Sequence, residues 1–253
     1  MEKIKNYEVY TSRMQKSMYD KMFFVDKIFE HNIDTIIDFG CADGELILHL
    51  HQFMPEVRFI GYDIDETMLE KAREKVPFAE FYSDWNAIIV NPKTTLLNLS
   101  SVVHEVFFYS CPIEIKTFWE NILTQNFAYI AVRDMFRSQK VRPVNQEWID
   151  IIQNTKYSAL FEKFVKHWGT PCSENDVMHF LLKYRYVENW DRELAENYFP
   201  INKEDFVKHF SEYSIAYEKY DSLPFLVAQI KKDFNIDAKD VPTHYYLILK
   251  HNK

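Results

Sequence analysis

The chain has 253 residues, of which 47% are hydrophobic and 17% aromatic, so it can bury a large core and is not a mostly disordered protein. Its formal net charge is −8, and the excess lies in residues 1–136, which carry 21 acidic and 13 basic side chains. Residues 137–253 are balanced, with 17 of each. Because no basic stripe of the kind that binds a phosphate backbone is visible, nucleic acid is a disfavoured partner.

The cysteines and the N-terminus indicate the compartment. Cys41, Cys111 and Cys172 are far apart and odd in number, which is typical of reduced thiols and not of a disulfide framework or a zinc site. The first ten residues lack the apolar stretch of a signal peptide, and no window reaches the roughly 18 uninterrupted apolar residues that a membrane span needs. We therefore expect a soluble, cytoplasmic protein.

The first half of the chain alternates between helical and strand patterns. Residues 12–31 place apolar side chains at steps of three and four, which predicts an amphipathic helix. The short apolar run at 35–39 ends at Gly40 and is typical of a buried parallel strand. The pattern then predicts a helix at 45–53, a strand at 57–61, a helix at 66–75, strands at 79–82 and 94–99, helices at 102–109 and 113–124, and a strand at 127–132. Such alternation implies βαβ units and a parallel sheet.

The second half is first helical and then returns to strands. Residues 144–210 have helical apolar spacing, and we interpret them as a helical insertion or lid between two sheet strands. The remaining elements are a strand at 214–220, a helix at 225–234 and a strand at 244–249. We predict an α/β fold with a mostly parallel, seven-stranded sheet and helices on both faces. The expected organisation is an N-terminal helix and α/β core at 1–136, the insertion at 137–210, and C-terminal strands at 211–253.

The residues that carry chemistry gather between positions 36 and 76. One strand ends at Asp38, a turn of small residues runs from Gly40 to Gly44, and the next strand ends near Asp63. Small residues let a ligand approach the backbone, the helix that follows offers unpaired N–H groups, and an acid at the end of the second strand can accept both ribose hydroxyls. This pattern indicates a nucleoside cofactor.

The turn departs from the dinucleotide fingerprint. Ala42 and Glu45 stand where G-x-G-x-x-G requires glycine, and the Glu45 carboxylate would oppose a pyrophosphate. The acidic first half of the chain suits a cofactor that has no phosphate and carries a positive centre. The sequence therefore disfavours a dinucleotide.

These segments resemble the class I S-adenosylmethionine-dependent methyltransferases. DFGCADG, at 38–44, resembles the first motif of the family, an acid-x-G-x-G/A-x-G turn, and GYDIDETMLEKAREKV, at 61–76, is similar to the second. Residues 82–85, LNLSSVVHEV at 97–106 and AYIAVRDM at 128–135 resemble the third, fourth and fifth strands with their exits. The five segments follow the order of the family and cover about residues 35–135.

The resemblance implies a Rossmann-like fold in which the core at 1–136 binds the cofactor, S-adenosyl-L-methionine, with S-adenosyl-L-homocysteine as its product. Residues at the first turn would line the methionine half of the cofactor: Asp38, Gly40, Cys41, Ala42 and Gly44. Asp63 would hold the ribose hydroxyls, and Ile64 would pack beside the adenine. Leu99 and Ser100, at the end of the fourth strand, would line the bottom of the cofactor site.

The adenine end of the implied site is less specific. Asp84 would accept a hydrogen bond from the adenine amino group, and Trp85 would stack nearby. Asp is also a favoured helix cap, and a tryptophan at this place could be plain core. Both interpretations stay open.

Two residues are candidates for catalysis. If the methyl acceptor is a hydroxyl or a protonated nitrogen, a side chain must take its proton, and histidine is best matched to neutral pH. His104 lies five residues past Leu99, where the family often places groups on the substrate side, and Asp134 ends the fifth strand. The alternatives are a capping or helix-surface histidine at 104 and an ion pair of Asp134 with Arg133 or another cation.

The expected acceptor is an oxygen or nitrogen of a small molecule, with aromatic compounds among the candidates, enclosed by residues 137–210; RNA and a non-catalytic S-adenosylmethionine-binding role stay open as alternatives. Arg13 or Lys16 of the N-terminal helix could meet the methionine carboxylate or form a solvated face. We expect no metal, since His49 and His51 would point apart on a helix. The sequence does not decide the oligomeric state.

Overall fold

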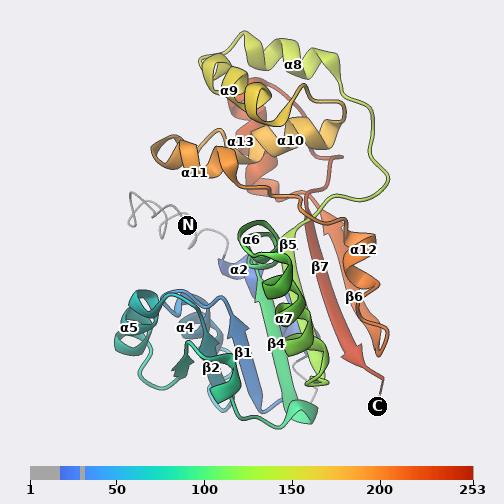
Figure 1. Ribbon diagram of the computed structural model, residues 1–253. Coiled ribbons are helices and arrows are strands. Elements are labelled where there is room, and N and C mark those ends of the chain that lie inside the picture. The colour runs from blue at the N-terminus through green and yellow to red at the C-terminus, as the bar shows by residue number, and fades with distance from the viewer. Residues whose placement is uncertain (1–17, 29–31, 253) are drawn as a thin grey trace. The chain divides into compact units, whose positions relative to one another are not determined.

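The computed structural model describes residues 18–28 and 32–252, and its strands form one seven-stranded sheet in the order β3-β2-β1-β4-β5-β7-β6 (Figure 1). The strands are β1 (Thr35–Phe39), β2 (Arg58–Tyr62), β3 (Glu80–Tyr82), β4 (Thr95–Ser100), β5 (Tyr129–Met135), β6 (Tyr213–Asp221) and β7 (His244–His251). The pairs β1–β2, β1–β4, β2–β3 and β4–β5 are parallel. The predicted Rossmann-like α/β fold with a mostly parallel sheet is confirmed.

The helices also follow the predicted order. They are α2 (Met18–Lys21), α3 (Val25–Ile28), α4 (Glu45–His51), α5 (Glu66–Lys75), α6 (Val103–Tyr109), α7 (Pro112–Leu123), α8 (Gln146–Gln153), α9 (Ser158–Trp168), α10 (Glu174–Lys183), α11 (Trp190–Ala195), α12 (Lys203–Val207) and α13 (Pro224–Phe234). Three short 3₁₀ turns are η1 (Trp85–Ala87), η2 (Pro92–Thr94) and η3 (Val187–Asn189). Within the described residues, every helix is too short or too polar to cross a bilayer.

The continuous helix predicted at 12–31 is wrong where the structure can test it. Residues 18–28 form two short helices, α2 and α3, separated by a turn at 22–24, and the other residues of the prediction lie outside the described ones. In the turn, the Val25 amide donates to the Met22 carbonyl over three residues, with an N···O distance of 3.0 Å. Phe24 is fully buried there. Packing of this ring against the core outweighs the helical ladder, which apolar spacing alone does not reveal.

The described chain forms two compact units. One contains residues 135–208 and 220–245, and the other contains the remaining described residues. The division into 1–136, 137–210 and 211–253 therefore stays a prediction about domain organisation.

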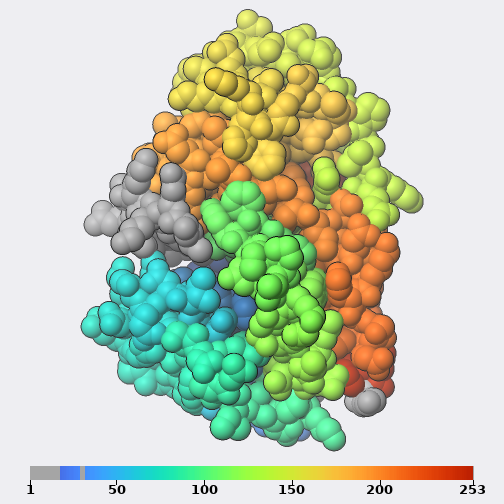
Figure 2. Space-filling view, viewed as in Figure 1, coloured from blue at the N-terminus to red at the C-terminus, as the bar shows by residue number. Residues whose placement is uncertain are grey.

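The larger unit holds the parallel strands. Every residue of β1 and β4 is buried, which is the near-continuous apolar pattern of strands covered on both faces. Helices α6 and α7 lie in front of the sheet (Figure 1), and their green atoms lie at the surface of this face in the space-filling view (Figure 2). The register pairs Asp38 of β1 with Gly61 of β2 and with Asn98 of β4. Polar side chains at the carboxyl ends of these strands therefore gather at one edge of the sheet.

The smaller unit has an aromatic core. Phe161, Phe180 and Tyr184 are at most 1% exposed and contact one another along α9 and α10. Lys183 is also fully buried, and its ammonium donates to the Glu193 carbonyl at 2.6 Å. Most aromatic side chains that the sequence places here thus serve packing within this unit.

Gly61 of β2 lies in a tightly packed place in the larger unit. A Cβ atom at this position would lie 2.5 Å from Cδ1 of Phe81 and 2.7 Å from Sγ of Cys41. We expect Gly61→Ala to lower the free energy of unfolding by about 1–3 kcal/mol, because a packed core has no room for the methyl group. Urea denaturation measures this loss. An unchanged free energy of unfolding in Gly61→Ala would contradict the packing argument.

Candidate active site

The turn between β1 and α4 is built from left-handed backbone. The φ angles of Gly40, Ala42 and Gly44 are 78°, 47° and 76°. At Gly40 a Cβ atom would also lie 2.7 Å from Cγ2 of Val102, so glycine is required there. Ala42 adopts the same conformation at a cost of about 1–2 kcal/mol. The turn is therefore strained at Ala42 and depends on its surroundings to hold it.

Cys41 contributes its backbone to the turn and its side chain to the core. The residue is buried, and its sulfur lies against Gly61 of β2. Burial raises the pKa of the Cys41 thiol well above its usual value, and the charge of Asp38 adds to this effect. A protonated, buried thiol is inert, which agrees with a role in filling space. The prediction that Cys41 lines the cofactor can therefore apply only to its backbone atoms.

Asp63 connects the turn to the second strand. Its Oδ2 accepts a hydrogen bond from the Ala42 amide at 2.8 Å, and its Oδ1 accepts one from the Asp65 amide at 2.9 Å. Burial raises the pKa of Asp63, and these backbone donors oppose the rise. A carboxylate has about four acceptor positions, so Asp63 keeps the capacity to accept two hydroxyls. Next to it, the Ile64 side chain is 71% exposed.

Asp84 and Trp85 follow β3, and both have a structural role. Asp84 is exposed and caps the short helix η1, with Oδ1 accepting from the Asn86 amide at 3.0 Å. Trp85 is buried, and its ring centroid lies 5.4 Å from that of Phe39 and 5.3 Å from that of Tyr62. The capping and core interpretations are thus seen in the structure, and the adenine contacts stay predictions.

Asp38 is a buried carboxylate at the end of β1. Its Oδ1 accepts a hydrogen bond from Nδ2 of Asn98 at 2.7 Å, and the Ser100 hydroxyl donates to Oδ1 of Asn98 at 3.0 Å. Burial raises the pKa of Asp38 to about 6, although Asn98 and the charge of Lys21 lower it. Leu99, between these two β4 residues, is fully buried. The sequence analysis missed Asn98, whose one signal is an amide inside the apolar run TLLNLS.

Lys21 of α2 is the second residue that sequence reasoning missed. The side chain is buried, and burial followed by the charge of Arg133 lowers the pKa of Lys21 to about 8. The carboxylates of Asp38 and Asp134 act in the opposite direction and favour the ammonium form. Arg13 and Lys16, the cations predicted from the sequence, lie outside the described residues. Lys21 is thus a cation at the carboxyl edge of the sheet.

Arg133 of β5 fixes α2 to the sheet. Its Nε and Nη2 donate to Oδ2 of Asp20 at 2.7 and 2.6 Å, and its Nη1 donates to the Ser101 hydroxyl at 2.9 Å. Asp20 also accepts a hydrogen bond from the Tyr246 hydroxyl at 2.6 Å. Arg133 is therefore occupied in holding Asp20, so the alternative that it pairs with the neighbouring Asp134 gains no support.

His104 and Asp134 form a buried pair. Nδ1 of His104 lies 2.6 Å from Oδ1 of Asp134, and the His104 backbone amide donates to Oδ2 at 3.2 Å. His104 is 6% exposed and Asp134 is fully buried. A carboxylate that accepts from Nδ1 fixes the tautomer of the neutral ring, in which the lone pair resides on Nε2. The two residues predicted separately as catalytic are thus brought together by the fold.

The charges around the turn suit the cofactor that the sequence implies. Asp38 is a buried carboxylate hydrogen-bonded by a neutral amide, which fits the ammonium of a methionine chain. Asp63 fits a pair of ribose hydroxyls, and the left-handed turn lets a ligand come close to the backbone. The acidic side chains Asp43 and Glu45 oppose a phosphate. The residues present therefore fit S-adenosylmethionine better than a dinucleotide.

The pKa of Asp38 predicts how affinity depends on pH. Holding an ammonium requires the ionised carboxylate, whose pKa is raised to about 6 in the free protein. As pH falls through this value, Asp38 takes up a proton that the ligand must displace, so we expect the affinity for S-adenosylhomocysteine to fall roughly tenfold between pH 7 and pH 5. Calorimetry at several pH values measures this change in affinity. In Asp38→Asn the affinity is lower and this pH dependence is reduced; an unchanged slope would contradict the assignment.

Part of the chain matches a known protein family. Residues 36–93 match the family model of a methyltransferase domain. No curated protein matches the chain in sequence. Among solved structures, the MccD protein has a TM-score of 0.51 at 11% identity, with 92% of this chain and 96% of that chain covered.

Two further structures show the same fold. The methyltransferase domain of bacterial CtHen1-CN has a TM-score of 0.50 at 12% identity, covering 93% of this chain and 98% of its own. The PH0226 protein from Pyrococcus horikoshii OT3 has a TM-score of 0.50 at 12% identity, covering 98% of this chain and 93% of its own. At these identities the likeness concerns the fold alone.

Proposed function

We propose that the chain is a class I S-adenosylmethionine-dependent methyltransferase and that it methylates an oxygen or nitrogen of a small molecule, with His104 as the general base. The pair of His104 and Asp134 carries this proposal, because it offers a buried, oriented imidazole at the same sheet edge as the cofactor turn. An acceptor that loses a proton on methylation needs such a group.

Each part of the site has a distinct task in this reaction. S-adenosylmethionine, when bound, supplies an activated methyl group that is transferred by in-line displacement. Asp63 holds the ribose, and the turn from Gly40 to Gly44 orients the methionine half. His104 takes the acceptor proton on Nε2, while Asp134 holds the ring and stabilises the imidazolium that forms.

The charge distribution supports a small acceptor over RNA. Residues 1–136, which carry the site, hold 21 acidic and 13 basic side chains, and the phosphate backbone of an RNA would be repelled by that excess. All three cysteines are free thiols, which supports a cytoplasmic location as part of the proposal.

A methyl-release assay tests the proposed activity. The protein is incubated with labelled S-adenosylmethionine and, in separate reactions, with panels of phenols, amines and short RNAs. We expect label transfer to a phenol or an amine in the wild-type protein. Transfer to RNA alone, or binding of the cofactor with no transfer to any acceptor in a small-molecule cell extract, would contradict the proposal.

A further inference from the structure

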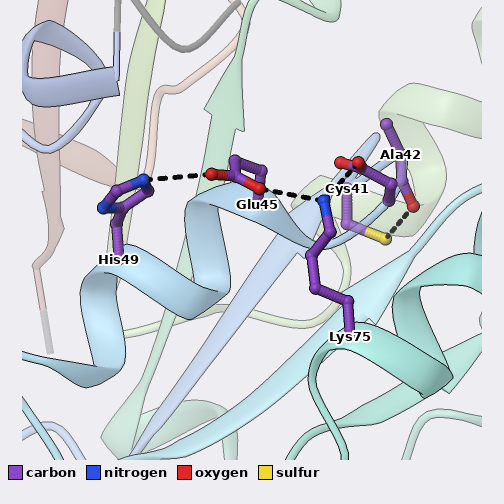
Figure 3. Close-up of polar contacts among 6 residues, drawn as sticks. Cys41, Ala42, Glu45, His49 and Lys75 are labelled. Carbon is purple, nitrogen blue, oxygen red and sulfur yellow. Dashed lines mark hydrogen bonds and ion pairs between the residues drawn. The ribbon is translucent and has the colours of Figure 1, made fainter. Parts of the chain in front are cut away.

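The far end of α5 contacts the cofactor turn through one lysine. The Lys75 ammonium donates to Oε2 of Glu45 at 2.9 Å and to Oδ2 of Asp43, and Oε1 of Glu45 lies 3.2 Å from Nε2 of His49 (Figure 3). Lys75 is the last residue of α5, whereas Asp43 and Glu45 flank Gly44 at the start of α4. One side chain thus joins the end of one helix to the beginning of another.

Two hydrogen-bonding contacts hold the turn, and the contact of Lys75 is the second of them. In the loop between β2 and α5, Asp63 accepts a hydrogen bond from the Ala42 amide at 2.8 Å. At the end of α5, Lys75 donates to Asp43, the residue that follows Ala42. The body of α5 lies against the turn, since a Cβ atom on Gly44 would lie 3.3 Å from Cβ of Ala72. The turn is therefore held by the loop that precedes α5 and by the last residue of the helix.

The backbone strain at Ala42 explains why the turn needs both contacts to keep its conformation. Its φ of 47° is unfavourable for a residue with a side chain, and such a conformation persists only where the surroundings hold it. Asp63 fixes the amide of Ala42, which leaves the rest of the turn to be fixed from the other side. Lys75 does this through Asp43 and Glu45.

The pKa shifts of Glu45 and Lys75 favour the charged forms that make this contact. Burial alone would raise the pKa of Glu45, but the hydrogen bond and charge of Lys75 outweigh burial and lower it. Conversely, burial lowers the pKa of Lys75, and the bonds to Asp43 and Glu45 outweigh burial and raise it. Glu45 and Lys75 therefore stay charged at neutral pH. The side chains are only 20–32% exposed, so solvent screens them less than an open surface pair.

We propose that Lys75 is a positioning residue that fixes the cofactor turn for binding of the methionine half, acting through Asp43 and Glu45. The inference rests on the proposed function, because it assumes that the turn binds S-adenosylmethionine. Lys75 itself contacts no cofactor in this proposal. It reduces the conformational cost of binding by holding the turn in its bound form beforehand.

The test compares two ligands on Lys75→Met by calorimetry. S-adenosylhomocysteine has the methionine half and adenosine lacks it. We expect the affinity for S-adenosylhomocysteine to fall about tenfold in Lys75→Met, while the affinity for adenosine, which depends on Asp63, changes much less. Lys75→Arg keeps the positive charge and is expected to recover most of the loss. A residue that mattered only for stability would weaken both ligands alike.

Arg73→Met is the matched control. Arg73 lies on the same helix and pairs with Glu66 at 2.6 Å, so its replacement removes the same charge without touching the turn. Glu45→Gln provides a second variant for the clamp, should Lys75→Met fold poorly. Unchanged binding of S-adenosylhomocysteine in Lys75→Met, or an equal loss in Arg73→Met, would overturn the inference. If the wild-type protein binds neither ligand, the proposed function fails instead.

Discussion

Replacing His104 with alanine is expected to lower turnover about 10²-fold or more, while the dissociation constant for S-adenosylhomocysteine stays close to that of the wild type. In the proposed mechanism the imidazole, which Asp134 holds at 2.6 Å, takes the acceptor proton and has no part in binding the cofactor. Methyl-transfer rates at saturating substrates, together with calorimetry on the same samples, measure the two effects separately.

Asp134→Asn tests the orientation of the ring. The amide keeps the size of the side chain, but its carbonyl and NH₂ groups cannot both replace a carboxylate that accepts from Nδ1 and from the backbone amide of His104. We expect a loss of rate in Asp134→Asn and the pH dependence of the rate to change with it. Full activity of His104→Ala across neutral pH would remove the histidine from the mechanism, and the acceptor would then need no general base.

Asp63→Ala is expected to weaken cofactor binding by roughly 1.5–3 kcal/mol for each charge-assisted hydrogen bond that is lost. The carboxylate would hold the ribose, and it also accepts the Ala42 amide at 2.8 Å, so its removal loosens the turn as well. Both effects act in the same direction. Calorimetry with S-adenosylhomocysteine and with adenosine measures the loss, and both ligands are expected to be affected because both carry the ribose.

Asp65→Ala is the matched control for this prediction. Asp65 lies two residues away and carries the same charge, but its Oδ1 caps α5 by accepting from the Thr67 amide at 3.0 Å. Loss of a cap costs about 1 kcal/mol of stability and need not alter the ribose contact. An unchanged dissociation constant in Asp63→Ala, or an equal loss in both variants, would contradict the ribose assignment.

The elements with local signals could be predicted from sequence. The helix expected at 66–75 has these limits in the structure, because Asp65 caps its first turn and Val76 leaves the helical conformation. The buried strand at 35–39 is likewise observed as expected. The helix at 12–31 fails because its interruption at Phe24 comes from packing against residues distant in the chain, and no local spacing reports that contact.

The candidate site divides in the same way. The turn and Asp63 lie within 26 residues of one another in the sequence and follow a contiguous pattern, so they could be predicted together. The contact of Asp38 with Asn98 joins residues 60 apart, and that of His104 with Asp134 joins residues 30 apart. Both depend on sheet register: β4 lies between β1 and β5, and Ser100 is paired with Arg133. Only the assembled sheet brings these side chains together.

Titration of the wild-type protein with S-adenosylmethionine and with S-adenosylhomocysteine is the most direct test, because every assigned role requires a site for them. Calorimetry is predicted to show saturable binding of both at a single site, roughly in the micromolar range. Circular dichroism on the same sample establishes that the protein is folded. A folded protein that releases no binding heat with either compound at several temperatures, and is not stabilised by either against thermal unfolding, would contradict the account.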